Sequence, residues 1–192
     1  VIAPWRNDKW KLQSRQDEIE YCKAHGIDLP FSTDQSYSRD RNLWHISHEG
    51  LELEDPSQEP NYEHLLMLTT PPEKAPEKPE YVTMTFEKGV PTSVNGKKMK
   101  VSDIIKELNE IGGRNGIGII DIVENRVVGM KSRGVYETPG GTILMEAHAQ
   151  LEELCLDRAT MEMKKEMGAK LAQVCYEGKW FTPLCDAIAR SE

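Results

Sequence analysis

Residues 121–142, which begin within a predicted strand at 117–123, constrain the fold of this chain more than any other stretch. Residues 117–123 are rich in β-branched side chains and bounded by glycines, a pattern that predicts a central strand buried on both faces. Polar side chains follow, and Thr142 is the predicted N-cap of a helix from Ile143 onward. The stretch therefore holds charged groups between the end of a strand and the start of a helix, where ligands commonly bind in α/β folds.

The polar residues of this stretch have two readings. They could bind a charged ligand, or they could form a surface turn with solvated charges. The cations Arg126, Lys131 and Arg133 could offset phosphate charge, but they fit an ordinary solvated face equally well. We assign these three residues no role. The full polar set is Glu124, Asn125, Arg126, Lys131, Ser132, Arg133, Tyr136 and Glu137.

The remaining segments mix helices with short strands. The strand signals are alternation and β-prone composition, and they indicate a meander with a tight turn at Asn95-Gly96. Segment 32–41 reads as a polar loop, and 51–79 as mostly irregular with one helical turn near 62–68. The predicted strands are 43–47, 81–86 and 91–94.

Helices are predicted from capping residues and apolar spacing. Ser14 with Asp17 three residues later indicates the start of one helix. Ser102 caps another, which Gly112 and Gly113 should end. The methionines at 161, 163 and 167 are available for helix packing. The predicted helices are 14–26, 103–111, 143–155, 157–176 and 184–190.

Length and charge limit the possible functions. A chain of 192 residues can bury a good core as one domain, or as a domain with a helical extension. The formal net charge of −8 argues against nucleic acid as a partner, because phosphate binding needs a concentrated basic face. An anionic ligand would therefore need local cations.

The cysteines and the hydropathy pattern point to a cytoplasmic protein. Cys22, Cys155, Cys175 and Cys185 form no CxxC pair, so neither a disulfide framework nor a zinc site is indicated. The spacing of His45 and His48 resembles a metal motif, but no further ligand accompanies them. No signal peptide or membrane-spanning run is present.

Four segments of the sequence resemble argininosuccinate synthase, in the same order along the chain. They read APWR at 3–6, SYSRDRNLWHISHEGLELEDP at 36–56, YVTMTFEKGVPTSVNG at 81–96, and VENRVVGMKSRGVYETPGGT at 123–142. Together they extend over most of the chain, which makes chance similarity a poor explanation. The resemblance implies an α+β fold with a mainly antiparallel sheet, covering helices, and long C-terminal helices used in oligomerisation.

The resemblance also implies a reaction. Argininosuccinate synthase is an ATP-dependent ligase that joins citrulline and aspartate through a citrullyl-adenylate, in arginine biosynthesis or a urea cycle. It uses ATP with magnesium and is a homotetramer. Matching the motifs residue by residue places the citrulline contacts on Ser38, Ser47, Glu124 and Tyr136. A carboxylate can pair with the ligand ammonium, and hydroxyls can donate to its carboxylate or ureido group.

Each of these residues also has a structural reading: a loop cap for Ser38, a strand-surface residue for Ser47 and a core tyrosine for Tyr136. For Glu124 the structural reading is a strand-end carboxylate that satisfies nearby backbone or Arg126. The family match favours the binding role.

The resemblance implies that this chain is one half of the enzyme. The family binds ATP with an N-terminal SGGxDS-type loop that the sequence lacks, and Gly140-Gly141 resembles a phosphate-binding turn only weakly. Val1 in place of Met indicates a chain that begins within a longer product. We expect 1–142 to be the citrulline-binding domain and 143–192 a helical segment for oligomerisation, truncated at its C-terminus. The chain alone should be inactive.

Two other classes remain open from the sequence. The chain could be an assembly module whose working surface is the long Met-bearing helices. It could also be an unrelated small-molecule-binding domain, if its pocket is lined by groups other than the four named residues. Citrulline binding distinguishes the first alternative from the ligase half.

Overall fold

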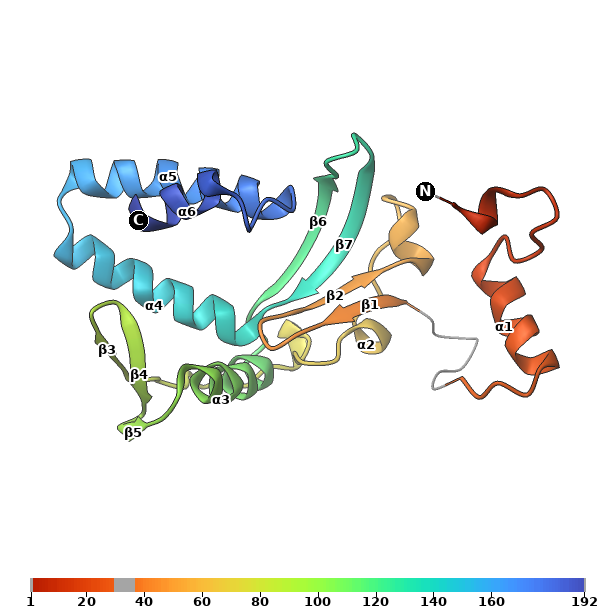
Figure 1. The fold of residues 1–192 in the computed structure, drawn as a ribbon. Coiled ribbons are helices and arrows are strands. Elements are labelled where there is room, and N and C mark those ends of the chain that lie inside the picture. Colours follow the sequence, from red (N-terminus) through yellow and green to blue (C-terminus); the bar gives the residue numbers. More distant parts are fainter. Residues whose placement is uncertain (1, 30–36, 192) are drawn as a thin grey trace.

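The computed structural model describes residues 2–29 and 37–191, and its fold is α+β (Figure 1). Two antiparallel sheets and a set of helices confirm the predicted fold class. The larger sheet has the strand order β1-β2-β7-β6. Its strands are β1 (Ser38–Arg41), β2 (Ile46–Glu49), β6 (Ile119–Asn125) and β7 (Lys131–Glu137).

The first hairpin differs from its prediction at both strands. The part of the predicted loop that lies within the described residues contains strand β1, which pairs with β2 along its whole length. The strand β2 starts at Ile46 rather than at 43, because Asn42 makes a turn. The Asn42 side-chain oxygen accepts hydrogen bonds from the backbone N–H groups of Trp44 and His45. The charged β1 sequence, SRDR, is typical of an edge strand and gave no strand signal.

The prediction that 117–123 is a central strand buried on both faces is wrong. Residues 119–123 of this segment belong to β6, which lies at the edge of the sheet and pairs only with β7 among the described strands. The exposed fractions of Ile120, Ile122 and Val123 are 53%, 43% and 51%. Branched residues favour extended backbone at an edge as well as in the centre, so their presence did not determine the strand's position.

The smaller sheet confirms the predicted meander. Its strands follow one another in space in the order of the sequence, and the last two are joined through Asn95 and Gly96, both at positive φ. It packs with two helices around a core that contains Val94, Leu108 and Leu144. The strands are β3 (Met84–Glu87), β4 (Val90–Val94) and β5 (Lys97–Lys98).

Helix α3 (Val101–Arg114) is longer than predicted. It starts before Ser102, and it continues through Gly112 and Gly113 instead of ending there. Packing explains the two glycines. A Cβ at Gly112 would lie 2.8 Å from the Pro139 Cβ, and one at Gly113 would lie 2.1 Å from the Leu68 carbonyl oxygen. Both glycines are required by close packing against neighbouring segments, and they do not mark the C-terminus of the helix.

Helix α4 (Pro139–Cys155) begins four residues before the predicted start, so the prediction of Thr142 as N-cap is wrong. Thr138 is the N-cap and Pro139 occupies the first turn, where its fixed φ suits a helix. The Thr142 hydroxyl lies inside that turn and donates to the Thr138 carbonyl, at 2.7 Å. Gly140 and Gly141 are therefore helical residues.

Two further helices confirm the long C-terminal helical region. They are α5 (Arg158–Tyr176), capped by Asp157, and α6 (Pro183–Ser191). Val174, Cys185 and Ile188 form a small core between them, with Met167 packed against it. Whether 1–142 and 143–192 are separate units stays a prediction, although Leu144 shares a core with Leu108.

The shorter elements agree with the sequence. Ser14 and Asp17 form the predicted capping box at the start of α1 (Arg15–Ala24). The helical turn near 62–68 is α2 (Tyr62–Leu65). Short 3-10 helices are η1 (Pro4–Arg6), η3 (Leu51–Glu54) and η4 (Pro72–Lys74). Across the described ranges, the helices are too short or too polar to cross a membrane.

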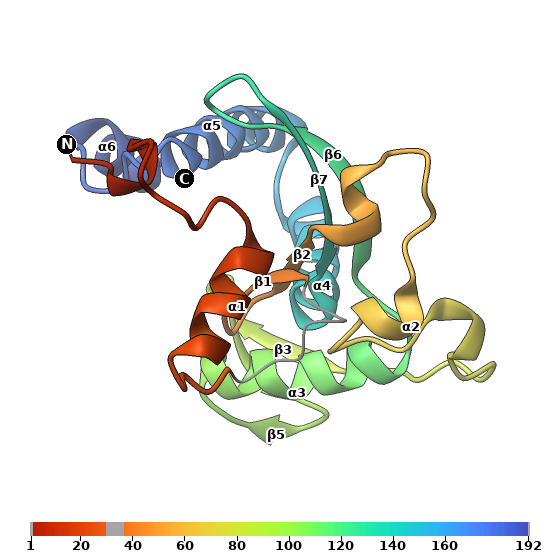
Figure 2. The ribbon, with the colours of Figure 1, turned by 90° about the vertical axis from the view of Figure 1, so that its right-hand side faces the viewer.

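The larger sheet has two unlike faces (Figure 2). On one side lie η3 and α2, whose Leu53 and Leu65 pack against Val135 of β7. We call this side the packed face; its strand residues include Arg39, Ile46, His48, Asp121, Arg133, Val135 and Glu137. We call the other side the open face; its strand residues are Ser38, Asp40, Ser47, Glu49, Ile120, Ile122, Glu124, Ser132 and Tyr136.

Candidate functional site

All four residues implied by the family resemblance lie on the open face. The register pairs Ser47 directly with Tyr136, and residues directly opposite each other in an antiparallel pair point to the same side. Ser38 is a diagonal neighbour of Ser47 across the β1–β2 hairpin. Glu124 lies opposite Ser132, which is on the same side of β7 as Tyr136. Residues that are up to 98 positions apart are thus brought to one surface.

Tyr136 and Glu124 are in direct contact. The Tyr136 hydroxyl donates to Glu124 Oε1 at 3.0 Å, in a partly buried setting. Burial, followed by the hydrogen bond and the charge of Glu124, raises the pKa of Tyr136 to about 12. The phenol therefore stays protonated at neutral pH and keeps the hydrogen that it donates to Glu124. The second oxygen of Glu124 is available for a cationic group.

The two serines differ in their surroundings. Ser47 has an exposed fraction of 7%, and its hydroxyl makes only a long 3.5 Å hydrogen bond to the Asp40 carbonyl. Ser38 is exposed at the start of β1. A hydroxyl with one weak partner can reorient towards a ligand without losing much, so Ser47 is the better placed of the two serines.

Glu49 and Arg126 belong to the same surface, and the sequence analysis did not assign them. The Arg126 Nη2 donates to Glu49 Oε2 at 2.7 Å and to the Ser132 hydroxyl at 3.0 Å. This bridge ties the end of the β6–β7 hairpin to β2. The alternation along β2 could have identified Glu49, since it lies two residues after Ser47 and therefore on the same face.

Arg133 has a structural role on the packed face. Its guanidinium makes two hydrogen bonds to Asp121, at 2.9 and 2.7 Å, and its Nη1 donates to the carbonyls of Asp55 and Gln58. It thereby fastens the loop after η3 to the sheet. Lys131 is exposed at the start of β7.

His45 and His48 point to opposite sides of the sheet. His48 is fully buried against Glu137, whereas the His45 ring lies 6.1 Å from the ring of Tyr136. Within residues 2–29 and 37–191, no three His, Cys, Asp or Glu side chains are grouped as metal ligands would be.

Gly140 and Gly141 are explained by packing. A Cβ at Gly140 would lie 2.7 Å from the Asn109 backbone nitrogen, and one at Gly141 would lie 2.8 Å from the Trp44 ring. The Asn109 side chain also accepts a hydrogen bond from the Gly140 N–H, at 2.9 Å. That N–H is already bonded within the protein, which weakens the comparison with a phosphate-binding turn.

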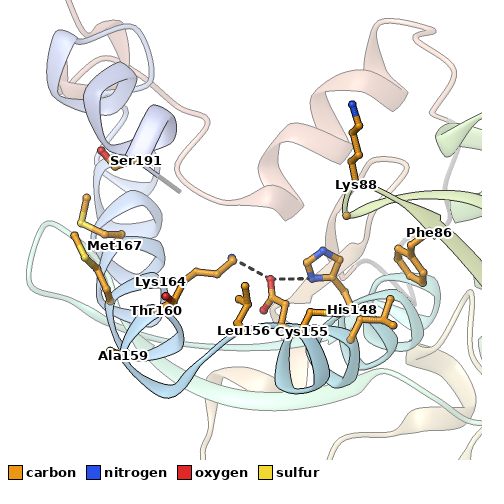
Figure 3. A pocket seen from close by; sticks show the side chains of 14 residues that line it. Phe86, Lys88, His148, Cys155, Leu156, Ala159, Thr160, Lys164, Met167 and Ser191 are labelled. Carbon is orange, nitrogen blue, oxygen red and sulfur yellow. Dashed lines mark ion pairs between the residues drawn. The ribbon is translucent and has the colours of Figure 1, made fainter.

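A separate cavity of about 910 Å³ lies between the β3–β4 hairpin, α4 and α5 (Figure 3). Its wall is mostly apolar and includes Phe86 and Met163. Glu152 lies on this wall and forms ion pairs with His148, at 3.2 Å, and with Lys164, at 3.3 Å. None of the four predicted citrulline contacts lines it, so the cavity and the open face are distinct places.

Comparison with known proteins defines the class of this domain. The family model described as arginosuccinate synthase C-terminal domain matches residues 37–191. The chain belongs to this family, as the sequence motifs predict.

Individual relatives agree with that assignment. The chain is 85% identical over 188 residues to an argininosuccinate synthase from Agathobacter rectalis and 76% identical over 188 residues to one from Lachnospira eligens. It is 59% identical over 189 residues to one from Acetivibrio thermocellus. Each match covers 98% of this chain and 46% of the relative, so the chain spans about half the length of these proteins.

Proposed function

We propose that this chain is the citrulline-binding and oligomerisation half of an argininosuccinate synthase. The observation that carries the proposal is the sheet register, which puts Ser38, Ser47, Glu124 and Tyr136 on one face. The family assignment supports it. The parent enzyme would be an ATP-dependent ligase that condenses citrulline with aspartate in arginine biosynthesis, and we expect it in the cytoplasm.

The open face has the groups that a zwitterionic amino acid needs. Glu124 has one oxygen engaged by Tyr136, and the other can accept from the ligand ammonium. The Ser47 hydroxyl and, at the rim, the Ser38 hydroxyl can donate to the ligand carboxylate or to the ureido group. Binding of the amino-acid end in this way would orient the ureido end of citrulline towards a nucleotide. This contribution to catalysis is one of proximity and orientation.

The chemistry we propose for the parent enzyme takes place at that far end. The ureido oxygen attacks the α-phosphate of ATP, pyrophosphate leaves, and the aspartate amine then displaces AMP from the citrullyl-adenylate. Magnesium would accompany the ATP. We assign no residue of this chain to the reacting atoms, and we propose that ATP and aspartate bind mainly outside it.

Oligomerisation is the second part of the proposal. It would be the whole function of the chain under the alternative, an assembly module that binds no ligand. Large apolar side chains are exposed on the C-terminal helices and on the turn before α6. They are Met145, Leu151, Leu154, Met163, Tyr176, Trp180, Phe181 and Leu184. Exposed apolar surface of this kind favours a partner, and a homotetramer is the assembly we propose.

Calorimetric titration of the full-length protein tests the proposal. Citrulline should bind, whereas α-N-acetylcitrulline, which lacks the ammonium charge but keeps the ureido group, should bind much more weakly. Equal affinity for the two compounds would exclude Glu124 as the ammonium partner. No binding of either compound, in a protein that still forms tetramers by light scattering, would leave the assembly module as the function.

A further inference from the structure

A row of three polar side chains crosses the packed face, behind the proposed citrulline site. The Arg39 Nε donates to His48 Nδ1 at 3.1 Å, and His48 Nε2 lies 2.7 Å from Glu137 Oε2. His48 and Glu137 both have an exposed fraction of 0%. The row therefore joins β1, β2 and β7 through side chains as well as through the sheet.

The direction of each hydrogen bond in the row is fixed by Arg39. A guanidinium can only donate, so His48 Nδ1 is the acceptor and Nε2 carries the hydrogen that it donates to Glu137. Glu137 also accepts three backbone N–H bonds, from Met67, Leu68 and Thr69, at 2.9, 2.8 and 2.7 Å. Both of its oxygens are engaged, which leaves the carboxylate a single favourable orientation.

Each member of this row directly follows a proposed citrulline contact. Arg39 follows Ser38, His48 follows Ser47, and Glu137 follows Tyr136. Successive residues of a strand point to opposite faces, so a side chain that is fixed on the packed face also fixes the position of its neighbour on the open face. A slip of one residue in register would reverse every side chain on the strand.

We propose that Arg39, His48 and Glu137 are positioning residues for citrulline, which hold β1, β2 and β7 in the register that the site requires. This inference rests on the proposed function. It does not extend to Glu124, because β6 contributes no member of the row. Arg126, through its bonds to Glu49 and Ser132, supports that side of the site instead.

The test compares two substitutions of His48 in the full-length protein. His48→Leu removes the donor to Glu137 and should lower kcat/KM for citrulline about tenfold or more, since small displacements of a bound substrate are costly. The KM for ATP should stay within about twofold, because the nucleotide does not contact these strands in the proposal. His48→Gln keeps a donor and should restore most of the activity towards citrulline.

Arg39→Met provides a second and milder variant in case His48→Leu does not fold. It removes the donor to Nδ1 at a partly exposed position, and it should lower kcat/KM for citrulline by about threefold or more. Leu108→Ala in the other core is the control. It should lower the melting temperature without changing kcat/KM for citrulline.

The outcomes separate this inference from the proposed function. If the wild-type protein does not bind citrulline, the proposed function fails. If the wild-type protein binds citrulline, but the His48 and Arg39 variants lower only the melting temperature, as Leu108→Ala does, the row serves stability alone and the inference is wrong. A fall in kcat/KM that His48→Gln reverses, at a temperature where all variants are folded, supports it.

Discussion

Glu137 on the packed face and Glu124 on the open face of the larger sheet are used differently. Glu137 on the packed face is fully buried and accepts hydrogen bonds from His48 and three backbone N–H groups. Glu124 on the open face is partly exposed, and among the described residues Tyr136 is the one donor recorded for it. Glu137 is therefore committed to the fold, whereas Glu124 can accept more hydrogen bonds.

The comparison shows that residue type alone does not indicate a binding residue. When a buried carboxylate has both oxygens in hydrogen bonds, its substitution lowers stability strongly, and it has no free acceptor for a ligand. When a carboxylate on an open surface has one hydrogen-bond donor, its substitution lowers stability little, and it can still pair with a cation. Removing Glu137 should therefore cost mainly stability and affect citrulline only through the position of Tyr136, whereas changing Glu124 should alter affinity directly.

The largest expected effect is on the packed face. Glu137→Ala leaves His48 and three backbone N–H groups without their acceptor, and it should lower the free energy of unfolding by about 3–5 kcal/mol. Urea denaturation followed by circular dichroism measures this. Glu153→Ala, at an exposed position on α4, is the control and should change stability by less than about 0.5 kcal/mol. A loss for Glu137→Ala no larger than that for Glu153→Ala would contradict the structural role of Glu137.

Glu124→Gln on the open face should change affinity. It keeps the side-chain shape but removes a charge-assisted hydrogen bond worth about 1.5–3 kcal/mol, which weakens citrulline binding roughly ten- to hundredfold. The effect should appear in the KM for citrulline and leave that for ATP nearly unchanged. Glu153→Gln serves as the matched control. Intact citrulline affinity with a lower melting temperature would instead make Glu124 a structural residue.

Glu137 should also make the free energy of unfolding depend on pH in the acid range. Burial opposes ionisation of Glu137, but its hydrogen bonds from His48 and the backbone outweigh burial and hold its pKa below the ordinary 4.5. A pKa that is lower in the folded state stabilises the protein above pH 4.5, and this contribution is lost as the pH falls below that value. Unfolding measured from pH 7 to pH 3 should show this loss, and Glu137→Gln should flatten it. An unchanged slope in the variant would assign the acid sensitivity to other groups.

Tyr136→Phe should give the smallest effect. It removes the hydrogen bond that Tyr136 donates to Glu124 but leaves the carboxylate charge in place, so citrulline should bind only roughly two- to tenfold more weakly. The ring stays in place, and the melting temperature should change little. Calorimetry on the variant and on Tyr176→Phe, an exposed tyrosine of α5, provides the comparison. A loss as large as that of Glu124→Gln would mean that the hydroxyl contacts a charged group of the ligand.

The sequence predicted the elements whose signals are local. The capping box of Ser14 and Asp17 and the turn at Asn95 and Gly96 depend on neighbouring residues, and both are confirmed. The edge position of β6 and the existence of β1 depend on which strands pair. Pairing is a long-range property, and neither the branched residues of β6 nor the charges of β1 encode it.

The candidate site shows the same division. Ser38, Ser47, Glu124 and Tyr136 came from family resemblance, and their common face follows from a register that no local pattern gives. The ion pair of Arg126 with Glu49 was not predicted because it joins residues 77 positions apart. The row of Arg39, His48 and Glu137 was not predicted for the same reason, since His48 and Glu137 are 89 positions apart.

The close approach of α3 to its neighbours has a consequence for interpreting sequence variants. Gly112 and Gly113 lie where a methyl group would overlap Pro139 and the Leu68 carbonyl, and neither is a proposed ligand contact. In a deep mutational scan these two positions should rank among the least tolerant, even against alanine. A catalogue of inactivating variants would then group them with Glu124, although the damage is to assembly of the core. Measuring protein abundance beside activity separates the two kinds of intolerance.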